Sequence, residues 1–135
     1  MGAWGPGSFE NDGAQDLVHD LTDLADAGID IVRDVLERAA DADDDDYVDV
    51  DDASAAVAAA EMVAAGLGKG DDRLNDEAVD WVAGYRRKLA RHDLVLARRA
   101  VERILSSSEV QELWDEAGKD NAWRKSVSEL LRRLS

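Results

Sequence analysis

The densest group of side chains with chemical potential is the acidic segment 41–52, which contains eight aspartates. Carboxylate oxygens suit Ca²⁺, and an EF-hand loop takes its ligands from positions 1, 3, 5, 7, 9 and 12, with glycine at position 6. Placed on that pattern, the candidate side-chain ligands are Asp41, Asp43, Asp45, Asp49 and Asp52. Asp46 stands in place of the glycine, and the last ligand is aspartate instead of the longer glutamate. We therefore favour a solvated acidic loop, with calcium binding as the alternative.

The remaining reactive side chains form no catalytic pattern. His19 and His92 are the two histidines, and they lie far apart with no paired metal-ligand spacing. The glycine-rich segment 66–70 lacks the spacing of a phosphate-binding loop and leads into two aspartates. There is no cysteine, so a thiol nucleophile or thiolate metal site is excluded. We predict no catalytic residue and no cofactor, and an enzyme is the third hypothesis for function.

The charge is concentrated in the first half of the chain. Residues 1–60 carry 17 acidic and two basic side chains, which gives −15, whereas residues 61–135 carry 14 of each sign. Such a field repels nucleic acids and anionic membranes and attracts basic proteins. We therefore expect a basic protein partner and neither nucleic acid nor membrane. The residues predicted to contact it are Asp43, Asp44, Asp45 and Asp46.

A cluster of basic residues between positions 86 and 103 opposes this trend. Its members are Arg86, Arg87, Lys88, Arg91, Arg98, Arg99 and Arg103. The favoured interpretation is a solvated helix face that also forms ion pairs with the acidic half of the same molecule. The alternative interpretation is a basic recognition helix.

The elements that position these side chains are predicted to be helices. Of the 61 hydrophobic residues 22 are alanine, the strongest helix former, and the chain has one proline. Apolar residues recur at helical spacing, and no long stretch alternates with period two. We predict a compact all-α bundle of five to seven helices forming a single domain over 1–135, with an irregular packed arm at 1–10 and an acidic loop at 41–52. The expected helices cover about 14–25, 29–39, 53–66, 76–83, 93–105, 106–117 and 120–134.

The predicted helix at 53–66 is unusual because most of its residues are small and apolar. A helix that is apolar on most sides is buried, so we expect it at the centre of the bundle. Glu61 is the one charge in its second half, and a buried carboxylate needs a partner. An arginine from the later helices is the predicted partner. Trp81, Trp114 and Trp123 are expected to fill gaps between helices.

The opening residues carry a distinctive pattern, Trp-Gly-x-Gly-x-Phe-x-Asn-Asp-x-Ala-x-Asp, which places Trp4, Phe9, Asn11 and Asp12 at fixed positions. This pattern resembles the start of an uncharacterised bacterial family, the domain of unknown function numbered 4259. The alanine-rich segment 58–65 and the residues 112–114 are similar to that family too. Physically, the two rings are suited to anchoring the arm, and Asn11 or Asp12 to capping the first helix.

The resemblance implies a small helical bacterial protein without an assigned activity, in a family that includes candidates for toxin immunity. No apolar run is long enough to span a membrane or resembles a secretory signal, so we expect a cytoplasmic location. Together, the residues predict a non-catalytic interaction module that docks a basic partner through its acidic N-terminal half. The most specific form of this prediction is an immunity-like role.

Overall fold

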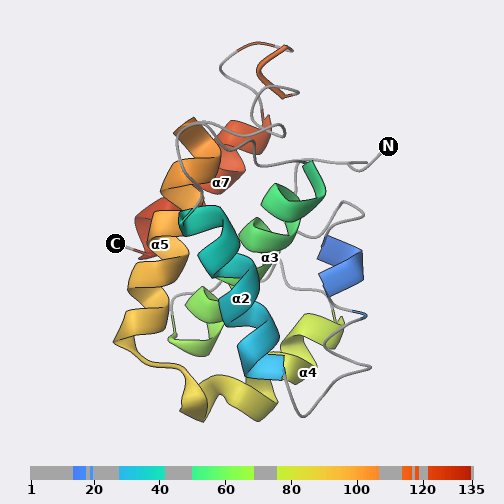
Figure 1. Ribbon diagram of the computed structural model, residues 1–135, viewed down its shortest axis with the longest axis vertical. Helices are drawn as coiled ribbons and strands as arrows, with labels where there is room; N and C mark the ends of the chain where they lie inside the picture. The colour runs from blue at the N-terminus through green and yellow to red at the C-terminus, as the bar shows by residue number, and fades with distance from the viewer. Residues whose placement is uncertain are drawn as a thin grey trace.

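The computed structural model of the chain describes residues 14–17, 19, 28–41, 50–68, 76–106, 114–116, 118 and 122–134. Their elements, in chain order, are the helices α2 (Gly28–Ala40), α3 (Val50–Gly66), α4 (Asp76–Tyr85), the 3-10 helix η2 (Arg86–Lys88), α5 (Arg91–Ser106) and α7 (Ala122–Leu134) (Figure 1). None of the described residues lies in a β-strand. The all-α prediction is therefore confirmed.

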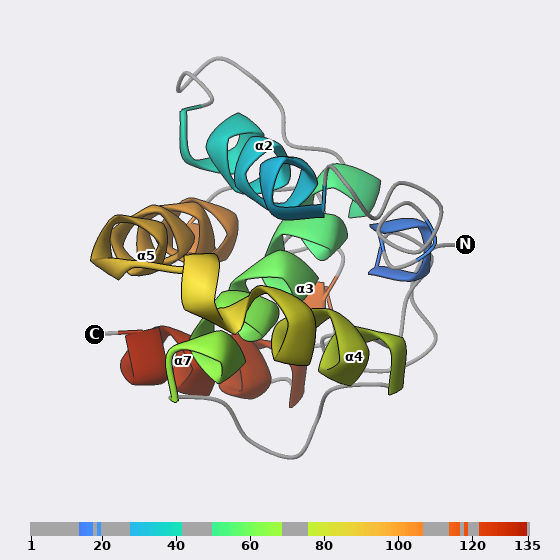
Figure 2. The same ribbon diagram turned by 90° about the horizontal axis from the view of Figure 1, so that it is seen from below.

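Helix α3 lies at the centre of the molecule, as its composition predicted. Seen along its length in Figure 2, the bundle places α2, α4, α5 and α7 around α3, and each of the four contacts it. Nine residues of α3 between Ala53 and Ala64 are buried apolar side chains, and six of them are alanine. Because alanine is small, neighbouring helices approach α3 closely on several sides.

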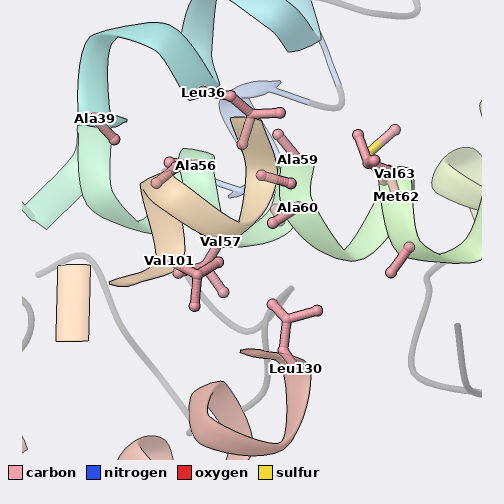
Figure 3. Close-up of a cluster of buried hydrophobic side chains, with 14 of the residues drawn as sticks. Leu36, Ala39, Ala56, Val57, Ala59, Ala60, Met62, Val63, Val101 and Leu130 are labelled. Carbon is pink, nitrogen blue, oxygen red and sulfur yellow. The ribbon is translucent and has the colours of Figure 1, made fainter. Parts of the chain in front are cut away.

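The core is a set of aliphatic side chains that converge on α3 from the surrounding helices. In Figure 3, Leu36 from α2, Val101 from α5 and Leu130 from α7 point toward the alanine-rich surface of α3, and all three are buried. Every described α-helix contributes to this core, including α4 through Trp81. Trp81 and Trp123 are buried and Trp114 is partly buried, in agreement with the predicted gap-filling role.

Helix α3 begins at Val50, three residues earlier than predicted. The prediction of an acidic loop that extends to residue 52 is therefore wrong at its end. Asp51 and Asp52 lie in the first turn of α3 instead of before it. Carboxylates are favoured there because the helix dipole presents partial positive charge at its N-terminus.

Helix α5 also begins earlier than predicted, at Arg91 instead of about Asp93. The carboxylate of Asp93 accepts a hydrogen bond from the backbone N–H of Ala90 at 3.0 Å. Asp93 is therefore the third residue of the helix, reaching back to cap it, and not the residue before it. An aspartate suits both positions, which is why the sequence pattern misplaced the start by two residues.

The other helix boundaries follow the glycine and cap positions closely. Helix α4 begins directly after Asn75 and continues one residue beyond Gly84 into η2. Gly118 has a φ of 111°, and its N–H donates to the carbonyl of Asp115 at 3.0 Å, as expected for a glycine that ends a helix. Residues 14–17 are helical, with Ala14 and Leu17 buried. The predicted arm at 1–10, with Trp4 and Phe9, and the caps Asn11 and Asp12 lie outside the described residues.

Candidate functional site

Four acidic side chains form a stripe along the outer face of α2. We call Asp30, Asp34, Glu37 and Asp41 the acidic stripe; all four are exposed. Their spacing of four, three and four residues places them on one face of the helix, with Asp41 directly after its last turn. The opposite face of α2 carries Val32, Leu36 and Ala39, which are buried. Packing of the apolar face therefore fixes the direction in which the acidic stripe points.

The acidic stripe extends the acidic region that the sequence singled out. The residues predicted to contact a partner, Asp43, Asp44, Asp45 and Asp46, lie outside the described residues. Asp41 lies two residues before Asp43 along the chain, so the acidic stripe ends just before the predicted contact residues in the sequence. The sequence interpretation followed the density of aspartates and missed the stripe. Its signal was present as acidic residues spaced opposite the apolar positions of α2.

The calcium prediction rests mainly on residues outside the described stretches, namely Asp43, Asp45 and Asp49. Of the two other candidate ligands, Asp41 forms an ion pair with Arg99, and Asp52 is an exposed residue of α3. Within the described part of the chain, no group of three or more histidine or acidic side chains is arranged to hold a metal ion. Calcium binding by the segment 41–52 stays a prediction.

Two arginines neutralise part of the acidic stripe. Arg38 lies one turn from Asp34 on the same helix, and its Nε donates to Asp34 Oδ2 at 3.1 Å. The hydrogen bond with Asp34 raises the pKa of Arg38. Arg99 reaches across from α5, and its Nη2 donates to Asp41 Oδ1 at 3.0 Å. Asp30 and Glu37 form no direct ion pair in the described part of the chain, although the charges of both act on the nearby Arg33, so the stripe keeps part of its negative charge.

A different arginine of α2 ties this helix to α5. Arg33 donates from Nε to Asp93 Oδ1 at 2.7 Å and from Nη2 to Asp93 Oδ2 at 3.1 Å, and it also reaches the carbonyl of Lys88. Burial by itself raises the pKa of the Asp93 carboxyl, but the hydrogen bonds from Arg33 and from the Ala90 N–H outweigh it, so that pKa lies below its ordinary value. This pair fixes α2 against the start of α5 and thereby orients the acidic stripe.

The predicted partner of Glu61 is Arg133 on α7. Arg133 Nη2 lies 2.9 Å from Glu61 Oε1, and Arg133 Nε lies 3.3 Å from Glu129 on the same helix. The Glu61 side chain is 2% exposed and that of Arg133 is 14% exposed. The prediction of a late-helix arginine is confirmed. The contact joins α3 to α7 and its carboxylate is buried in the bundle, which indicates a structural role.

The predicted neutralisation of the acidic half by the cluster 86–103 is limited in the described residues. Arg99 pairs with Asp41, but the neighbouring Arg98 pairs with Glu102 on its own helix at 2.9 Å. Helices α5 and α7 lie side by side, and both are rich in arginine (Figures 1 and 2). Among the described residues, α2 with Asp41 therefore carries more acidic than basic side chains, whereas α5 and α7 carry more basic than acidic ones, and the Asp41–Arg99 ion pair joins the two regions.

The sequence of the chain matches a known protein family. The model of one family, described as Domain of unknown function (DUF4259), matches residues 2–126. The chain belongs to this family. The match confirms the membership that the opening residues suggested, and it covers every described helix except the last part of α7.

DUF4259 membership gives the chain a family and no activity. No curated protein and no solved structure matches the chain. Among the described helices, none has the length and apolarity required to span a membrane. The signature residues Trp4, Phe9, Asn11 and Asp12 fall in the matched range but outside the described residues, so their predicted structural role is untested.

Proposed function

We propose that this DUF4259 protein is a non-catalytic binding module that docks a basic protein partner through its acidic N-terminal half. The observation that carries the proposal is the acidic stripe on α2. Its four carboxylates stand on the exposed face of a helix whose other face is anchored in the core. Asp41 ends the stripe and also begins the acidic segment 41–52, so further aspartates follow the stripe in the sequence.

The size and charge of the stripe suit a cationic protein surface. From Asp30 to Asp41 the helix advances about 16 Å, which is enough to engage several arginine or lysine side chains at once. The N-terminal 60 residues carry the entire net charge of −15, and such a field accelerates the approach of a basic partner. The same field opposes binding to nucleic acids, because those are polyanions.

The specific role that we propose for the protein is an immunity-like one in the bacterial cytoplasm. A toxin that cleaves nucleic acid needs a cationic groove to bind the phosphates of its substrate. An acidic protein surface can occupy such a groove and keep the substrate out, with charge complementarity setting the partner choice. The charge split along the chain supports this role, and the absence of a reaction-specific sequence motif supports a non-catalytic one.

A comparison of two charge-matched double variants tests the proposal. D30N/E37Q removes two carboxylates from the acidic stripe, whereas D16N/D80N removes two exposed carboxylates from other helices. Binding of a fluorescent arginine-only peptide is measured by anisotropy at low and at physiological salt. The same variants are then used to capture basic proteins from a lysate of the native host.

The proposal predicts that D30N/E37Q binds the peptide about three- to tenfold more weakly than the native protein, as expected for the loss of two exposed ion pairs. D16N/D80N is expected to lose much less, because it changes only the general field. An equal loss in both variants would show that the peptide senses the net charge and not the stripe, and the proposal would then be wrong.

A further inference from the structure

The Asp41–Arg99 ion pair occupies one end of the acidic stripe with a cation from the protein itself. Arg99 belongs to α5, and 58 residues separate it from Asp41 along the chain. A guanidinium from outside the stripe's own helix is therefore already bound at one of its carboxylates. We propose that Arg99 is an internal competitor, which holds Asp41 until an arginine of a basic partner replaces it. This inference rests on the proposed function and adds a means of regulating it.

The position of Asp41 makes it the strongest cation-binding point of the stripe. Its backbone N–H donates to the carbonyl of Glu37 at 2.8 Å, so Asp41 is held at the C-terminal end of α2. The helix dipole places partial negative charge at that end, and the carboxylate adds to it. A cation is favoured there for both reasons. In the isolated molecule, Arg99 supplies that cation.

The exposure of the Asp41–Arg99 ion pair allows its arginine to be replaced by another cation. The side chains of Arg99 and Asp41 are 55% and 62% exposed, so water and incoming ions reach both groups. Exposed ion pairs contribute little to stability, and a partner that offers several guanidinium groups can replace one of them. The Arg33–Asp93 pair, also between α2 and α5, is different, because its carboxylate is buried and accepts three hydrogen bonds. Thus α2 stays anchored to α5 while Asp41 is exchanged.

Helix α5 offers a matched control for this idea. Arg98 is the neighbour of Arg99, has a similarly exposed side chain at 52%, and also pairs with one carboxylate. That carboxylate is Glu102 on α5 itself, at 2.9 Å, and not a member of the acidic stripe. R98Q and R99Q therefore change the net charge equally, at adjacent positions, and differ in whether a stripe carboxylate is released.

The experiment measures the affinity of the arginine-only peptide for R98Q, R99Q and the native protein at low salt. Both variants gain a common increase in affinity from the lost positive charge. R99Q is expected to bind the peptide about two- to fivefold more tightly than R98Q, because it alone frees Asp41. In a D41N background this difference between R98Q and R99Q is expected to vanish, which identifies Asp41 as the group released.

The outcomes separate this inference from the function on which it rests. If peptide binding is unaffected by D30N/E37Q, the acidic stripe is not the docking surface, and the proposed function itself fails. If the stripe variant weakens binding while R98Q and R99Q bind equally, the docking surface stands and Arg99 is not a competitor. A difference between R98Q and R99Q that persists in the D41N background would also overturn the inference.

Discussion

The buried end of the Arg33–Asp93 pair allows a stability prediction whose size follows from the geometry. Replacing Asp93 with alanine removes the acceptor of three hydrogen bonds, two from Arg33 and one from the Ala90 N–H. The Asp93 side chain is 1% exposed, whereas that of Arg33 is 31% exposed. The variant therefore uncaps α5 and detaches α2 from it, but leaves Arg33 partly in water.

The expected cost combines these effects. Loss of a helix cap costs about 1 kcal/mol, and hydrogen bonds to charged groups contribute about 1.5–3 kcal/mol each. Removing one partner of a fully buried pair costs about 3–5 kcal/mol, but water can solvate the freed Arg33 and lowers that figure. We predict that D93A reduces the free energy of unfolding by about 2–3 kcal/mol, which corresponds to about 6–15 °C in Tm.

Urea unfolding monitored by circular dichroism measures this change, with D34A as the control. Asp34 is also an aspartate paired with an arginine, but its pair lies exposed on one helix and is worth about 0.3–0.5 kcal/mol. D34A is therefore expected to unfold almost like the native protein. If D93A and D34A agree within about 0.5 kcal/mol, the Arg33–Asp93 contact does not hold α2 against α5, and the orientation assigned to the acidic stripe loses its support.

Three further predictions follow from other contacts. R133A should lower the free energy of unfolding by about 3 kcal/mol, because it deprives the buried Glu61 of its guanidinium, whereas R132A at the exposed neighbouring position should change it by less than about 0.5 kcal/mol. The pKa of Asp93 is lower in the folded than in the unfolded chain. The Asp93 carboxylate therefore contributes fully to the free energy of unfolding above the unfolded pKa of about 3.9, and this contribution disappears as the pH falls through the folded pKa. The stability difference between the native protein and D93N, measured by urea unfolding, should be constant near neutral pH and shrink in acid. G84A should raise Tm and add up to about 1 kcal/mol to the free energy of unfolding, because Gly84 is helical with open space at its Cβ position. G118A should lower Tm, because Gly118 has a φ of 111°. A lower Tm for G84A or a higher Tm for G118A would contradict the assigned backbone conformations.

The parts of the fold that were predicted correctly depend on local pattern and on burial. The alanine-rich composition of α3 required a central position, since a helix that is apolar on most sides cannot face water. The same argument predicted an arginine partner for Glu61, because a buried carboxylate must be compensated. The identity of that arginine was not predictable, since it depends on where the end of α7 passes α3 in the folded bundle.

The errors occur where one residue type suits two local roles. Aspartate is favourable both before a helix and within its first turn, so the starts of α3 and α5 were placed too late by three and two residues. The acidic stripe was missed for another reason, because the run of aspartates at 43–46 dominated the charge pattern. The Asp41–Arg99 pair joins distant parts of the chain and has no signal in the sequence.

The central claim, that the outer face of α2 is the docking surface, is tested most directly by mapping peptide binding with NMR. Backbone amide chemical shifts of the isotope-labelled protein are followed during titration with the arginine-only peptide at physiological salt. We predict that the largest shifts lie along α2 at Asp30, Asp34, Glu37 and Asp41 and at Arg99 on α5, with small shifts at Asp16 and Asp80. Shifts of similar size at all exposed acidic residues, or shifts that leave α2 unchanged, would contradict the claim.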